Sequence, residues 1–144
     1  MSVETFLDTN VLLYHLDDSD ARKHRIAYRL VRQALARSDT VISFQVVQEC
    51  LNVALRKARV PLSHAEARDY FRLVLVPLWR IMPSSEIYLR GIDVQERYGF
   101  SFYDSLIVAA AIDAGCHRLY SEDLQHGQRI DGLTIENPFR VRSS

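Results

Sequence analysis

Short apolar segments alternate along this chain with longer segments of helical periodicity. The short segments are rich in aliphatic and aromatic residues and are too brief for helices, so we predict that they are strands. Some are apolar on both faces, as in parallel sheets that are buried from both sides. The predicted strands cover residues 3–7, 40–44, 77–82, 117–120 and 133–136.

The longer segments repeat apolar side chains every three or four residues, which gives a helix one apolar face. Ser63 and Glu66 form a capping-box pattern, and Gly99 and Gly115 stand where helices are predicted to end. The segment after residues 101–104 is apolar all round and is predicted to be a buried helix. The predicted helices cover residues 11–16, about 26–35, 46–58, 63–76 and 84–98, followed by the helix that opens at 101–104.

This alternation of strands and helices predicts an α/β fold with a mostly parallel sheet covered on both faces. The chain has 144 residues, of which 48% are hydrophobic, enough for one compact domain over residues 1–144. We find no internal repeat and no linker.

Composition narrows the functional classes. With 18 basic and 18 acidic residues the formal net charge is zero, which disfavours a highly basic protein that coats nucleic acid. Cys50 and Cys116 lie in apolar runs and are predicted to be buried reduced thiols. No segment has the ~18 consecutive apolar residues of a membrane span, so we expect a cytoplasmic protein without a membrane partner.

Four acids lie where predicted strands end or predicted helices begin. Asp8 and Asp123 follow predicted strands, whereas Glu49 and Asp104 lie near the starts of predicted helices. Strand ends and the helix starts after them share one edge of a parallel sheet with right-handed crossovers. We therefore expect the four carboxylates to meet in one groove.

Asp8, Asp104 and Asp123 also have a simpler interpretation as parts of helix caps, and for any one of them alone capping is favoured. Capping does not explain Glu49, nor the gathering of acids at one edge. Four carboxylates in one groove repel one another unless a cation neutralises them. The sequence therefore predicts a divalent-metal site.

Oxygen ligands point to Mg²⁺ or Mn²⁺, and the five histidines form no close pair for zinc. A metal held by carboxylates suits hydrolysis of a phosphodiester, because it activates water and stabilises charge on the leaving oxygen. Asn10 and Ser121 can support such a site by holding a carboxylate, although a capping role is equally compatible with both.

These residues resemble the PIN-domain family, and within it the VapC-type toxins of toxin–antitoxin pairs. The resemblance spans nearly the whole chain and is carried by four motifs in the right order. The matching segments are residues 8–10, 43–49, 103–111 and 121–124, the last together with 137–139.

The resemblance implies a three-layer α/β/α sandwich and an endoribonuclease that depends on Mg²⁺ or Mn²⁺. It implies that Asp8, Glu49, Asp104 and Asp123 are the catalytic, metal-binding quartet. Typical partners are an RNA substrate, a small antitoxin that blocks the active site, and a second toxin subunit in a homodimer. Some members carry a further acid after Asp123, and Glu122 is a possible substitute in this chain.

Two basic clusters are possible RNA contacts. Arg56, Lys57 and Arg59 gather at a predicted helix end, where cations also complement the helix dipole. A second cluster forms one face of an earlier helix, and a solvated outer face is its favoured interpretation. That cluster consists of Arg22, Arg25, Arg29 and Arg32.

Other functions are less well supported. A haloacid-dehalogenase enzyme would need an acid where this chain has Asn10, and a receiver domain would need a lysine near the groove. The five glycines never cluster as in nucleotide-binding loops. A PIN-like domain in RNA processing and a non-catalytic scaffold that binds RNA or protein remain as alternatives.

Overall fold

The chain folds around a six-stranded sheet in this computed structural model, which describes residues 2–141 and, for Lys57, the backbone alone. The strand order is β3-β2-β1-β4-β6-β5, and every neighbouring pair is parallel except β5 and β6. The strands are β1 (Thr5–Leu7), β2 (Thr40–Ser43), β3 (Trp79–Ile81), β4 (Arg118–Tyr120), β5 (Arg129–Ile130) and β6 (Leu133–Glu136).

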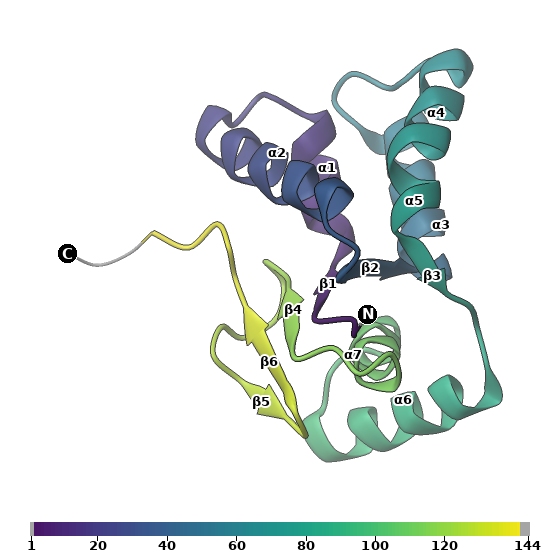
Figure 1. The fold of residues 1–144 in the computed structure, drawn as a ribbon, viewed down its shortest axis with the longest axis vertical. Coiled ribbons are helices and arrows are strands. Elements are labelled where there is room, and N and C mark those ends of the chain that lie inside the picture. Colours follow the sequence, from purple (N-terminus) through teal and green to yellow (C-terminus); the bar gives the residue numbers. More distant parts are fainter. Residues whose placement is uncertain (1, 142–144) are drawn as a thin grey trace.

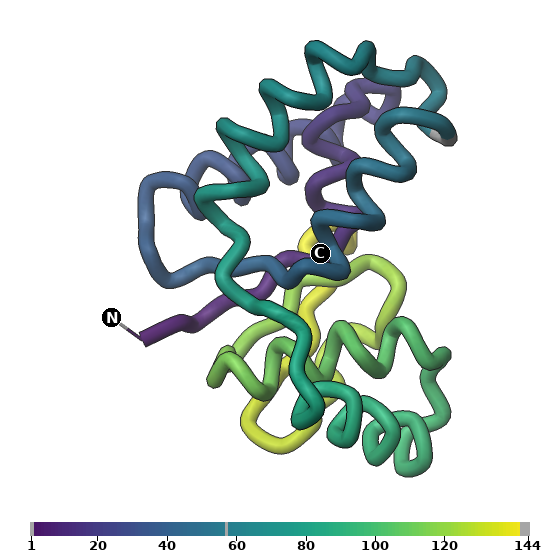
Figure 2. Tube along the Cα trace, turned by 90° about the vertical axis from the view of Figure 1, so that its right-hand side faces the viewer, coloured from purple at the N-terminus to yellow at the C-terminus, as the bar shows by residue number. Residues whose placement is uncertain are grey.

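Helices cover both faces of the sheet. The first five lie on one side of it and the last two on the other, as Figures 1 and 2 show. This arrangement is the predicted three-layer α/β/α sandwich. The helices are α1 (Thr9–Leu16), α2 (Ala21–Ala36), α3 (Phe44–Asn52) with the π-helical turn η1 (Val53–Lys57), α4 (His64–Tyr70) with the π-helical turn η2 (Phe71–Leu75), α5 (Val76–Leu78), α6 (Ser85–Tyr98) and α7 (Phe102–Asp113).

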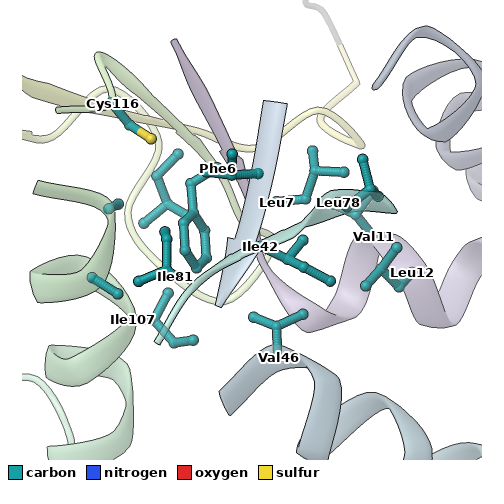
Figure 3. Close-up of a cluster of buried hydrophobic side chains, with 14 of the residues drawn as sticks. Phe6, Leu7, Val11, Leu12, Ile42, Val46, Leu78, Ile81, Ile107 and Cys116 are labelled. Carbon is teal, nitrogen blue, oxygen red and sulfur yellow. The ribbon is translucent and has the colours of Figure 1, made fainter. Parts of the chain in front are cut away.

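The hydrophobic core lies on both sides of the central strands. In β1, Phe6 points toward Ile107 of α7, whereas Leu7 points toward Val11 and Leu12 of α1 (Figure 3). Consecutive side chains of a strand face opposite sides of a sheet, so a central strand contributes to both halves of the core. This explains why β1 and β2 are buried along their whole length.

The structure departs from the predicted elements mainly at their ends. The first helix begins at Thr9 instead of residue 11, because Asp8 caps it. The second strand ends at Ser43, and Phe44 already starts α3. The short strand β5 was not predicted, although the turn Asp131-Gly132 that joins it to β6 is a common hairpin signal.

The carboxyl ends of the parallel strands form one edge, from which several helices begin. β1 leads directly into α1 and β2 directly into α3, while β4 leads into the loop that starts at Ser121. Cys50 and Cys116 are free and buried, as predicted, and burial raises the pKa of both thiols to about 12. Within residues 2–141, no helix combines the length and the apolar character that crossing a membrane requires.

Candidate active site

Asp8 is a buried carboxylate at the carboxyl end of β1. Its side chain caps α1 by accepting a hydrogen bond from the backbone N–H of Thr9, with Oδ1 2.7 Å from the nitrogen. Its other oxygen, Oδ2, accepts a 2.7 Å hydrogen bond from the hydroxyl of Ser121. Burial raises the pKa of Asp8 from 3.8 to about 7, these two hydrogen bonds oppose the rise, and the negative charges of Glu49 and Asp123 add to it.

Ser121 connects two of the predicted acids. Its buried hydroxyl donates to Asp8 and accepts a 3.2 Å hydrogen bond from the backbone N–H of Asp123. The amide of Asn10 completes the connection, because its Nδ2 donates to Oδ2 of Asp123 at 3.2 Å and its Oδ1 accepts from the backbone N–H of Glu122 at 3.3 Å. Residues 121–123 are thus tied to the start of α1.

Glu49 reaches the same region through Thr9. The Thr9 hydroxyl donates a 2.8 Å hydrogen bond to Oε1 of Glu49, which comes from the second turn of α3. Thr9 is therefore adjacent in sequence to the buried Asp8 and in contact with a second acid. Thr9 stands between Asp8 and Asn10 in the first motif, but its contact with Glu49, 40 residues along the chain, leaves no signal in the sequence.

Asp104 lies in the first turn of α7, where its backbone N–H is capped by Ser101 at 3.1 Å. Gln45 ties this turn to the start of α3, since its Nε2 donates to the carbonyl of Tyr103 at 3.1 Å. Gln45 and Glu49 lie one turn apart on the same face of α3. The carboxylate of Asp104 makes no hydrogen bond to the other three acids among the described residues.

The donor atoms at this edge suit a hard divalent cation. They are carboxylate oxygens, supplemented by hydroxyl and amide oxygens, which Mg²⁺ and Mn²⁺ prefer. Within residues 2–141, however, no three His, Cys, Asp or Glu side chains lie in an arrangement that would hold a metal ion. Without a cation the carboxylates repel one another and stay apart. Binding an ion would therefore require these side chains to move closer together.

Glu122 turns away from the carboxylates toward a separate cluster. Its Oε1 accepts a 2.6 Å hydrogen bond from the hydroxyl of Tyr14, and its Oε2 forms a 2.6 Å ion pair with Nζ of Lys23. Lys23 also lies 4.9 Å from the centre of the Tyr14 ring, and the hydrogen bond to Glu122 is the main cause of its raised pKa. Nothing in the sequence pointed to this cluster, because 99 residues separate Lys23 from Glu122.

The predicted basic cluster of Arg56, Lys57 and Arg59 lies at the end of η1 and just after it. Arg56 and Arg59 are exposed near the end of η1, and the Lys57 side chain is outside what the structure describes. Arg59 lines a cavity of about 360 Å³ between α1 and η1, and Asn10 lies on the wall of the same cavity. The cavity thus adjoins the polar residues of α1.

Residues 5–131 of the chain match the family model described as the PIN domain. No curated protein matches the chain as a relative.

Solved structures share the fold over most of the chain. A toxin–antitoxin complex from Klebsiella pneumoniae is 21% identical with a TM-score of 0.67, covering 96% of this chain and 100% of that one. VapBC2 from Rickettsia felis, bound to a DNA fragment from its promoter, is 20% identical with a TM-score of 0.66, covering 94% and 98%. VapC20 from Mycobacterium tuberculosis, a sarcin–ricin loop cleaving toxin, is 22% identical with a TM-score of 0.64, covering 83% and 90%. These likenesses confirm the predicted fold class.

Proposed function

The chain belongs to the PIN domain family, as its motifs predicted, and on that premise we propose that it is a divalent-metal-dependent endoribonuclease. The observation that carries the proposal is the state of Asp8. Asp8 is only 5% exposed, and its pKa is raised to about 7 by burial and by the charges of two further acids. An acid in such a place lowers the stability of the fold, so its presence is better explained by function. Strongly perturbed groups of this kind are typical of functional sites.

We assign the metal-binding and catalytic roles to Asp8, Glu49, Asp104 and Asp123. The oxygen donors fit Mg²⁺ or Mn²⁺, and the repulsion among Asp8, Glu49 and Asp123 would be relieved by a cation. A bound ion would lower the pKa of a water and offset charge on the phosphate during hydrolysis of an RNA phosphodiester.

The neutral residues around the acids hold them in place. Ser121 and the backbone of Thr9 fix the two oxygens of Asp8, while the Thr9 hydroxyl holds Glu49. Asn10 holds Asp123 without adding charge. Each of these donors favours the ionised form of the carboxylate that it contacts, and that is the form in which a carboxylate binds a metal.

We assign Glu122 a positioning role and no metal-binding role. Both of its oxygens already accept short hydrogen bonds, from Tyr14 and Lys23. The backbone of Glu122 is also held, by Asn10. Together these contacts fix the loop that carries Ser121 and Asp123 against α1 and α2.

We further propose that the protein is the toxin of a VapBC-type pair, acting in the cytoplasm and bound by a small antitoxin. The support is the shared fold with VapBC complexes and with the toxin VapC20. The cavity between α1 and η1 gives an antitoxin segment a place to bind beside Asn10. A homodimer is proposed on the same basis, and the exposed apolar side chains of Tyr88, Leu89 and Ile92 on α6 are available for it.

Cleavage of total RNA tests the ribonuclease proposal. We expect the wild type to cut RNA with Mg²⁺ or Mn²⁺ and to stop when EDTA is added, and we expect Asp8→Asn and Asp104→Asn to be inactive. Asp113→Asn is the matched control, because Asp113 is an exposed acid at the other end of α7. Equal cleavage by all variants, or cleavage that EDTA leaves unchanged, would refute the metal mechanism.

Partner assays are independent of catalysis. Co-expression with the product of a short reading frame directly upstream should yield a stable complex that does not cut RNA. Light scattering of the purified toxin should give the mass of two chains. A monomer, or an upstream product that does not bind, would contradict the corresponding partner proposal.

A further inference from the structure

A groove of about 990 Å³ runs beside α2 and shares no lining residue with the cavity at η1. One wall is α2, which contributes Arg22, Ile26 and Arg29. The other wall is formed by Tyr120 at the end of β4 and by residues within 136–141, a segment that starts with the last residue of β6. The groove therefore lies between two segments that are far apart in the sequence.

The charges that line this groove are mostly positive. Arg22 and Arg29 face Arg140 across it, and Glu136 is the carboxylate among the described lining residues. His126 also lines the groove, where its Nδ1 accepts a hydrogen bond from the backbone N–H of Asn137 at 3.0 Å, so that the neutral ring presents an N–H at Nε2. Three cations around one groove attract an anion.

The three arginines are available for such an anion. In the part of the chain that the structure describes, none of them forms an ion pair with a carboxylate. Lys23, beside Arg22 in the sequence, is by contrast paired with Glu122. Arg22 and Arg29 are two helical turns apart, about 10 Å along the helix axis, a spacing that suits a chain of phosphates better than a single small anion.

The groove adjoins the carboxylate site through Tyr120. Tyr120 lines the groove, and its carbonyl accepts a 3.0 Å hydrogen bond from the backbone N–H of Asp8. The next residue is Ser121, which holds the carboxylate of Asp8. A polyanion that lies in the groove would therefore approach the carboxylates around Asp8.

We propose that this groove binds the phosphate backbone of the single-stranded RNA substrate beside the scissile bond. The inference rests on the proposed ribonuclease function. The groove also separates the four arginines of the predicted helix face into two pairs. Arg22 and Arg29 line the groove, whereas Arg25 and Arg32 are exposed outside it.

Binding can be measured without cleavage. A fluorescently labelled, unstructured RNA of about 15 nucleotides is titrated in EDTA with the full chain carrying Asp8→Asn, and anisotropy gives the Kd over a range of salt concentrations. In this background the pair R22S/R29S is compared with the matched pair R25S/R32S, which removes the same charge from the same helix. Circular dichroism and thermal unfolding verify that both pairs fold.

We expect R22S/R29S to weaken binding roughly tenfold near 0.15 M salt, and to lower the slope of log K against log salt by about 1.4, since each phosphate contact with a single strand contributes about 0.7. R25S/R32S should change Kd less than about twofold, because those side chains make no phosphate contact under this proposal. Removing the opposing charge with Glu136→Gln should tighten binding about two- to fourfold.

Three results would overturn the proposal. They are equal losses in the two arginine pairs, no measurable RNA binding by the parent chain, and equally tight binding of a duplex DNA with the same dependence on Arg22 and Arg29. The last result would assign the groove to DNA. Binding through Arg22 and Arg29 by a protein that cuts no RNA would support the groove and refute the ribonuclease proposal, so the two failures are distinguishable.

Discussion

Replacing Asp8 with asparagine should change the stability of the protein in opposite directions at low and high pH. The pKa of this buried acid rises from 3.8 to about 7 on folding. Between these two values the folded protein keeps a proton that the unfolded chain releases, so the free energy of unfolding falls as the pH rises. One pH unit corresponds to about 1.36 kcal/mol, which gives a total loss of roughly 4 kcal/mol by neutral pH.

Asparagine does not titrate and therefore avoids this loss. Its single oxygen replaces one of the two hydrogen-bond acceptors that Asp8 offers to Thr9 and Ser121, at a cost of about 1 kcal/mol at every pH. The variant should thus be about 1 kcal/mol less stable than the wild type at about pH 3, below both pKa values. Above pH 8 it should be about 3 kcal/mol more stable.

Urea unfolding in EDTA, at about pH 3 and at about pH 8.5, measures both differences. Asp113→Asn is again the control, since an exposed acid should give a small difference that depends little on pH. A difference between Asp8→Asn and the wild type that stays the same at both pH values would refute the reasoning, because it would mean that folding does not change the pKa of Asp8.

Three further changes test the neighbours of Asp8. Thr9→Val removes the donor to Glu49, so it should lower the free energy of unfolding by about 1–2 kcal/mol and raise the Mg²⁺ concentration needed for half-maximal cleavage. Thr9→Ser keeps the hydroxyl and should match the wild type in both measurements. A valine variant equal to the wild type would contradict this. Ser121→Ala removes a hydrogen bond that lowers the pKa of Asp8, so the acidic limb of the pH–rate profile should move to higher pH, and an unmoved limb would count against the contact. Glu122→Gln should raise the Mg²⁺ requirement no more than Lys23→Met, which breaks the same ion pair from the other side, and a larger rise with Glu122→Gln would identify Glu122 as a ligand.

Much of the fold follows from local patterns in the sequence. Ser63 with Glu66 forms the capping box that was predicted, and Ser84 and Ser101 cap the helices that follow them. Gly99 ends α6 with a φ of 75°, a left-handed conformation that favours glycine. These signals operate over a few residues, so they can be recognised in one sequence on its own.

Contacts between distant segments could not be predicted in the same way. The ion pair of Lys23 with Glu122 and the contact of Gln45 with Tyr103 depend on how helices and loops pack. The division of the arginines on α2 between a groove and an open face likewise depends on where residues 136–141 run. Position at the sheet edge was predictable for the acids, whereas the hydrogen-bond partners of their carboxylates were not.

The two outer strands of the sheet are poor templates for adding another strand. β5 has only two residues, and its neighbour in the turn, Asp131, is paired with Arg90 of α6 at 3.8 Å. At the opposite edge, β3 has three residues, and Arg80 in its middle donates to the carbonyl of Ser38 at 2.6 Å. Short, charged edges discourage strand-to-strand association. Addition of a further strand at either edge is therefore disfavoured, and the protein should resist forming fibrils at concentrations at which a longer bare edge would aggregate.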